Sequence, residues 1–137
     1  MEIAGSKAYL IEFYEGEILY KKGDQKRAIE FWQKICANNP DNSLCYFLFA
    51  DECANFAMYD IAIEYYRRSF EIQTPPRRID SLISMLQIYE IKANYSEAYN
   101  VLNLILSVYE TDYVLTDGDE IQPYLDDRER IQKLITN

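Results

Sequence analysis

The stretch that decides the fold is residues 22–32, which read Lys22-Gly23-Asp24-Gln25-Lys26-Arg27-Ala28-Ile29-Glu30-Phe31-Trp32. A shift of 34 residues along the chain places Ala28 on Ala62, within a second copy of the same pattern. A further shift of 36 residues places Ala62 on Ala98, within a third copy. Self-similarity at such a period indicates stacked copies of one small structural unit.

Each copy contains two segments in which apolar residues recur at helical spacing. Ile29, Trp32 and Cys36 form one such stripe. Gly23 can end the first helix in the left-handed conformation, and Asp24 can cap the second. With one further amphipathic segment at the end of the chain, the sequence predicts an all-α protein of seven helices, over residues 5–22, 25–38, 41–57, 60–73, 78–92, 95–110 and 121–136.

The connections between the predicted helices carry stop and start signals. Residues 39–42 (Asn-Pro-Asp-Asn) disfavour helix continuation and supply capping groups for the third helix. Asp60 and Ser96 are the predicted caps of the fourth and sixth helices. Ala57 and Ala93 stand where the first copy has a glycine, so these two turns are expected to differ from the first.

The three copies carry motifs at matching positions: Lys22-Gly23-Asp24-x-x-x-Ala28-Ile29-x-Phe31-Trp32-x-Lys34 with Asn39-Pro40-Asp41, then Tyr59-Asp60-x-Ala62-Ile63-Glu64-Tyr65-Tyr66, then Asn94-Tyr95-Ser96-Glu97-Ala98. These motifs resemble the units of the tetratricopeptide repeat (TPR) family over about residues 8–110. The resemblance implies a right-handed α-α superhelix, a TPR-like solenoid. Its predicted organisation is a single domain over 1–137, with repeats over about 8–42, 43–77 and 78–111 and a capping helix over 120–136.

The first and last helices should differ from the inner ones, because each lies at an open end of the stack. In the first helix, Glu12 and Glu15 occupy positions where the family has large apolar residues. We interpret this face as uncovered by any earlier repeat; the alternative is a rotated helix or a degenerate first unit. The last segment has one apolar side that can seal the third repeat, formed by Ile121, Tyr124, Leu125, Ile131 and Ile135.

Composition excludes several functions. The 137 residues have a net charge of −9, so nucleic acid and anionic lipid are poor partners, and the chain has no apolar run long enough for a membrane span. The sequence contains no His, which removes the commonest general base and zinc ligand. Cys36, Cys45 and Cys53 form no paired spacing and indicate a reducing, cytoplasmic environment. We therefore expect no enzyme, no metal site and no cofactor.

The resemblance implies that the first helix of each pair lines a concave groove. The side chains predicted to line it are Phe13, Glu17, Tyr20, Phe47, Leu48, Asp51, Asn55, Ile83, Gln87 and Glu90. This mixture of apolar and acidic groups favours a peptide or protein segment with apolar anchors and basic flanks. One TPR subclass grips a C-terminal carboxylate with basic side chains, but the matching positions here are Phe13, Glu17, Leu48, Asp80 and Ser84, and none is basic.

The sequence therefore predicts a non-catalytic protein–protein interaction module, acting as an adaptor or as a small client chaperone. In size, acidity and groove character the chain is also similar to the three-repeat translocator chaperones of type III secretion. The alternative is a self-associating structural subunit of a larger TPR assembly. In that hypothesis Leu10, Phe13 and Tyr14 on the first helix pack against a second copy in a homodimer.

Overall fold

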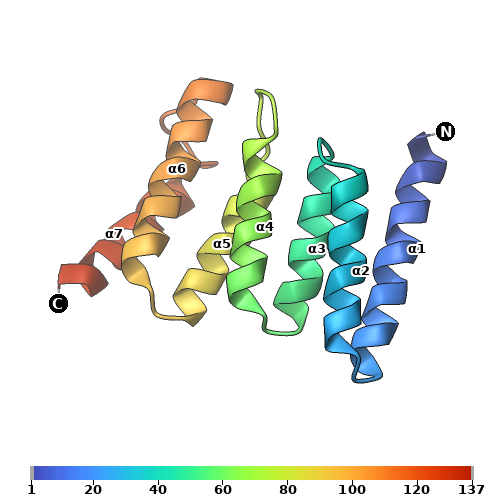
Figure 1. Ribbon diagram of the computed structural model, residues 1–137. Helices are drawn as coiled ribbons and strands as arrows, with labels where there is room; N and C mark the ends of the chain where they lie inside the picture. Colours follow the sequence, from blue (N-terminus) through green and yellow to red (C-terminus); the bar gives the residue numbers. More distant parts are fainter. Residues whose placement is uncertain (1, 137) are drawn as a thin grey trace. The chain divides into compact units, whose positions relative to one another are not determined.

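The computed structural model describes residues 2–136, with the side chains described from Leu10 onward (Figure 1). The regular secondary structure of these residues is entirely helical, which confirms the predicted all-α class. The helices are α1 (Glu2–Lys21), α2 (Gln25–Asn38), α3 (Ser43–Asn55), α4 (Tyr59–Glu71), α5 (Asp80–Ile91), α6 (Tyr95–Tyr113) and α7 (Gln122–Thr136). Helix α6 runs three residues further than expected, to Tyr113. The chain divides into two compact units, Met1–Ile72 and Gln73–Asn137.

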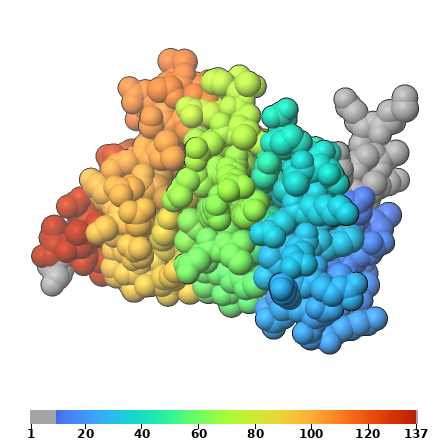
Figure 2. All heavy atoms as spheres, viewed as in Figure 1, coloured from blue at the N-terminus to red at the C-terminus, as the bar shows by residue number. Residues whose placement is uncertain are grey.

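The first unit consists of two helix hairpins, α1–α2 and α3–α4 (Figure 1). In both ribbon and space-filling views, α2 and α4 form the face toward the viewer, and α3 lies behind them (Figure 2). Each of these two front helices buries one apolar stripe, as the helical spacing predicts. The stripe of α2 contains Ala28, Trp32, Ile35 and Cys36.

The centre of the first unit is the indole of Trp32, which is fully buried. Its ring stacks near Tyr20 and Phe56, with both centroids 6.4 Å away, and lies 6.0 Å from the ring of Phe49. The indole Nε1 donates a hydrogen bond of 3.0 Å to the backbone carbonyl of Phe13. The close approach of α2 to α1 at this point requires a glycine: a Cβ built on Gly16 would lie 2.1 Å from that nitrogen.

The second unit consists of the hairpin α5–α6 with α7 packed against α6. Its core includes Leu102 and Ile105 of α6 together with Ile131 of α7, all fully buried. Arg128 of α7 also donates a hydrogen bond of 3.1 Å to the side chain of Asn103. Helix α7 therefore covers α6 as expected of a capping helix, but Ile135, predicted on its apolar side, is 39% exposed.

The segment before α5 is hydrogen-bonded to the end of α6. The guanidinium of Arg77 donates two hydrogen bonds to the carboxylate of Asp112, at 2.8 and 3.0 Å, and the backbone N–H of Arg77 donates a third at 2.8 Å. The hydroxyl of Tyr113 donates to the carbonyl of Arg77. The hydrogen bonds from Arg77 hold the pKa of the Asp112 carboxyl well below its usual range. These contacts hold the segment before α5 against the end of α6.

The three turns inside the hairpins have the same backbone conformation. Gly23, Ala57 and Ala93 all have positive φ, at 93°, 59° and 55°. In each turn this residue donates to the carbonyl three positions before it, and the next residue donates to the carbonyl five positions before it. The expectation that the two alanine turns differ was therefore wrong. The hydrogen bonds available at the helix end stabilise the left-handed conformation even where a Cβ is present.

Two predicted helix caps were also wrong. Helix α4 begins after Met58 rather than Asp60, and α6 begins after Asn94 rather than Ser96. Asn94 accepts a hydrogen bond from the backbone N–H of Glu97, so it caps α6 with its own side chain. Asn42 caps α3 in the same way, as predicted for the connector before it.

The equivalence of the turns predicts opposite effects for two reciprocal substitutions in the first unit. Gly23→Ala should lower the free energy of unfolding by about 1 kcal/mol, because an L-residue is strained at positive φ. Ala57→Gly should raise the free energy of unfolding by about 0.5 kcal/mol. The backbone strain that the glycine relieves exceeds the extra conformational entropy that a glycine loses on folding. Urea unfolding of both variants checks this. The same sign for both changes would contradict the equivalence of the turns.

Among the described residues, no helix is both long and apolar enough to cross a membrane.

Candidate peptide-binding surface

The predicted groove residues of α3 lie on one side of that helix. Phe47, Leu48, Asp51 and Asn55 follow one another at spacings of one, three and four residues, which places them along a single helical face. The first three side chains are half-buried and Asn55 is exposed. This face, which we call the α3 face, offers apolar and polar groups to solvent together.

The α3 face is held in place by Tyr66 of α4. The ring of Phe47 packs edge-on against Tyr66, with centroids 5.6 Å apart, and the Tyr66 hydroxyl donates a hydrogen bond to the carboxylate of Asp51. Burial raises the pKa of Asp51, and the hydrogen bond from Tyr66 opposes that shift. Two of the four groups on the face are therefore fixed before any partner arrives, which reduces the entropy lost on binding.

The three groove residues predicted on α1 lie in different environments. Phe13 is only 2% exposed and belongs to the core, so its assignment to an open groove was wrong. Tyr20 is half-buried and stacks on Phe56 of the α3–α4 turn, with centroids 3.8 Å apart. The carboxylate of Glu17 forms an ion pair of 2.9 Å with Lys21, one turn further along the helix. Tyr20 and Glu17 thus keep partly accessible surface beside α3.

Glu52 is a residue of this region that sequence analysis missed. It lies one helical turn after Leu48, at the edge of the α3 face, and helical spacing alone did not single it out. The fold instead brings its carboxyl within hydrogen-bonding reach of Glu17 on α1. Burial, followed by the neighbouring charge of Glu17, raises the pKa of Glu52 to about 7. Only the packing of α1 against α3 creates this pair, and no spacing in the sequence encodes it.

The remaining groove residues belong to the second unit. Ile83 and Glu90 on α5 are half-buried, and Gln87 between them is exposed. Glu90 accepts a hydrogen bond of 2.7 Å from the guanidinium of Arg130 on α7. This ion pair partly neutralises the acidic end of α5, so the second unit presents less free negative charge at these positions than the sequence implies.

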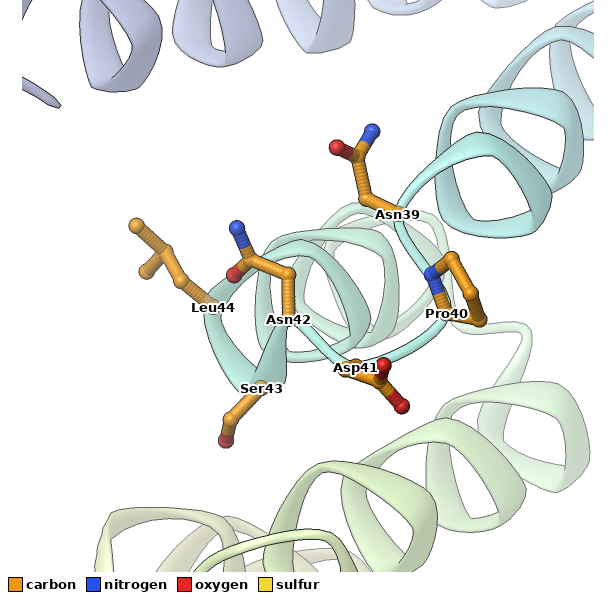
Figure 3. A pocket seen from close by; sticks show the side chains of 6 residues that line it. All are labelled: Asn39, Pro40, Asp41, Asn42, Ser43 and Leu44. Atoms are coloured by element: carbon orange, nitrogen blue, oxygen red, sulfur yellow. The ribbon is translucent and has the colours of Figure 1, made fainter. Parts of the chain in front are cut away.

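A pocket of a different kind lies at the connector between α2 and α3 (Figure 3). It is lined by Asn39, Pro40, Asp41, Asn42, Ser43 and Leu44 and is widely open to solvent. Figure 3 shows the side chains of Asn42 and Leu44 on one side of the connector and Ser43 on the opposite side. Ser43 is engaged with Ser69 of α4 through a hydrogen bond of 2.7 Å to its carbonyl. The pocket offers no nucleophile held by a base.

The three cysteines are unpaired thiols inside the first unit. Burial raises the pKa of Cys36 and of Cys53 to about 12, and that of Cys45 to about 11. Thiols with such values are poor nucleophiles at neutral pH. Within the described part of the chain, no three His, Cys, Asp or Glu side chains are grouped so that they could hold a metal ion.

Comparison with known proteins identifies the fold. No family model matches the chain, and no curated protein matches it in sequence. The TPR2B domain of yeast Sti1, in a complex with pHsp70, matches 93% of this chain and 95% of its own, with a TM-score of 0.60 and 14% identity. The TPR2AB domain of yeast Sti1, in a complex with pHSP90, matches 97% of this chain and 49% of its own, with a TM-score of 0.55 and 18% identity.

These structures are similar to the chain in fold and distant from it in sequence. The predicted tetratricopeptide repeat is therefore confirmed as the fold: helix hairpins with small residues at their close contacts and a final covering helix. Both neighbouring structures are complexes, one with pHsp70 and the other with pHSP90. The predicted similarity to secretion chaperones remains a prediction.

Proposed function

We propose that the protein is a non-catalytic interaction module whose α3 face binds a polypeptide segment with apolar anchors and basic flanks. The observation that carries the proposal is the arrangement on that face: Phe47 and Leu48 offer apolar surface beside the carboxylate of Asp51, and Tyr66 holds two of these three groups. A short peptide segment loses less entropy on binding when the apolar side chains and the charge that it contacts are already held in place.

The charge around the α3 face supports a basic partner. Glu17 and Asp51 bring two carboxylates to this side of the first unit, and Lys21 is paired with Glu17. The whole chain carries a net charge of −9. Lysine or arginine in the flanks of a bound segment would be attracted to this surface, with an affinity that falls as salt increases.

The ligands of the neighbouring structures do not carry over directly. In the subclass that grips a C-terminal carboxylate, basic side chains occupy positions that are Phe13, Glu17, Leu48, Asp80 and Ser84 here. Phe13 is buried, and Glu17 and Asp80 would repel a carboxylate. We therefore propose an internal or basic segment as ligand, in place of an acidic C-terminus.

A peptide-binding experiment tests this function. Labelled peptides with two or three apolar anchors, flanked either by lysine and arginine or by aspartate and glutamate, are titrated by fluorescence anisotropy. We expect the basic set to bind at least about tenfold more tightly than the acidic set. Phe47→Ala should weaken binding by about tenfold or more.

The control for Phe47→Ala is Tyr14→Ala, which removes an aromatic ring that is 61% exposed on α1 and is not part of the α3 face. It should leave the affinity unchanged. If no peptide of either set binds, or if both aromatic variants bind as the unchanged protein does, the α3 face is not the binding surface.

A narrower role is that of a client chaperone in the cytoplasm, which keeps an apolar segment of one partner covered until it is released. The three unpaired cysteines support a reducing compartment. Co-expression with a candidate client should then yield a complex of one copy each. A client that stays soluble without this protein would argue against the chaperone role and leave the adaptor role intact.

The second candidate function is self-association through α1. Leu10, Ile11, Tyr14 and Ile18 are all exposed on this helix, at 39% to 61%, and recur at helical spacing. An uncovered apolar stripe at the end of a repeat stack can pack against a second copy. Light scattering distinguishes the candidates: a stable dimer that Tyr14→Asp dissociates favours self-association, and a monomer at all concentrations rules it out.

A further inference from the structure

The contact between α1 and α3 contains a buried oxygen that lacks a hydrogen-bond donor. Oε2 of Glu52 is inaccessible to solvent, and no donor among the described residues reaches it. An unsatisfied buried acceptor is costly, and that cost is larger for a charged group. The carboxyl of Glu17 lies within hydrogen-bonding reach of Glu52, but two ionised carboxylates are both acceptors and repel each other.

A single proton would satisfy this arrangement. Lys21 is 2.9 Å from the carboxylate of Glu17, so this carboxylate has a cation beside it. Glu52, deeper in the contact, would then carry the proton and donate an O–H hydrogen bond to Glu17. The pair would have one negative charge, balanced by one lysine, in place of two charges balanced by one lysine.

We propose that Glu17 and Glu52 share one proton across the contact between α1 and α3, and that this contact weakens when the proton is lost. Loss of the proton leaves two carboxylates facing each other between the helices. The consequence is a weaker attachment of α1 to the rest of the first unit, beside the α3 face.

The groups that act on Glu52 come from both helices of the contact. From α1 these are Glu17, whose charge favours the proton, and Lys21, whose charge opposes it. From α3, Asp51 adds a second negative charge that favours the proton, and the Cys53 thiol also lies close enough to interact. Together with burial, these groups raise the pKa of Glu52 from its ordinary value of 4.5 to about 7.

The direction of the pH effect follows from this shift. The folded protein holds the proton more tightly than the unfolded chain, so the stabilisation is complete below about pH 4.5 and is lost as the pH rises through about 7. Over that window the folding equilibrium constant of the first unit should fall by roughly ten- to a hundredfold. Above pH 8 the pair should contribute no further change.

Urea unfolding of the full chain between pH 5 and pH 8 tests the proposal, together with a carbon-13 NMR titration of the Glu52 carboxyl. In the unchanged protein the Glu52 signal should titrate near pH 7, and stability should fall over the same range. Glu52→Gln supplies an amide N–H to Glu17 at every pH, so its stability should be flat between pH 5 and pH 8. Glu17→Gln should move the Glu52 titration to lower pH.

The control is Glu15→Gln, which changes an exposed carboxylate on the same helix. It should retain the full pH dependence of the unchanged protein. A Glu52 signal that titrates near pH 4.5, or the same loss of stability with pH in the unchanged protein and in Glu52→Gln, would overturn the proposal. Neither outcome depends on whether the α3 face binds a peptide.

Discussion

Replacement of Gly16 by alanine should lower the free energy of unfolding of the first unit by about 3 kcal/mol. The added Cβ would lie 2.1 Å from Nε1 and 2.7 Å from two carbons of the Trp32 ring. That ring cannot move aside easily, because it is fully buried among other aromatic rings and its N–H is bonded to the carbonyl of Phe13. Urea unfolding followed by circular dichroism measures the loss.

Two further variants distinguish this steric clash from a general effect of alanine on the stability of the helix. Glu15→Ala changes the neighbouring, exposed position and should alter stability by less than about 0.5 kcal/mol. The double variant Gly16→Ala with Trp32→Tyr recreates the residues of the second repeat, where Ala50 and Tyr66 occupy the equivalent positions. It should be more stable than Gly16→Ala alone. A single variant as stable as the unchanged protein would show that α1 and α2 are not in close contact at Gly16.

Replacement of Ile131 by alanine should lower the free energy of unfolding of the second unit by about 3 kcal/mol. Ile131 is fully buried where α7 packs on α6, so its removal leaves a cavity as well as losing apolar contact. Hydrogen exchange of α6 amides, followed by mass spectrometry, reports the stability of this unit separately from the first.

Ile135→Ala is the matched control, because it removes the same atoms from the same helix at a position that is 39% exposed. The loss there should be below about 1 kcal/mol. Equal losses for the two isoleucines would mean that α7 does not present Ile131 to the core, and that its role as the covering helix is wrong.

The repeat pattern predicted the helices because its small residues recur where helices pack closely. Small residues recur at Ala28, Ala62 and Ala98 where two helices of a hairpin approach each other, and all three are fully buried. The turns were predicted less well. Ala57 and Ala93 lack the freedom of glycine, yet hydrogen bonds at the helix end hold them in the same conformation as Gly23.

The candidate surface was predicted only where one helix determines it. Phe47, Leu48 and Asp51 share a face of α3, and helical spacing is enough to place them together. Phe13 was misplaced, because the rotation of α1 depends on the contact of Gly16 with Trp32, which turns Phe13 into the core. The pairing of Glu17 with Glu52 likewise depends on how α1 and α3 pack.

We have proposed that a polypeptide partner binds along the α3 face of the first unit. Amide chemical-shift changes in nitrogen-15 NMR spectra, recorded while a basic-flanked apolar peptide is added, test it most directly. The largest changes should fall on Phe47, Leu48, Asp51 and Asn55 and should decrease in the variant Asp51→Lys. Changes confined to the exposed stripe of α1, or none at saturating peptide, would contradict it.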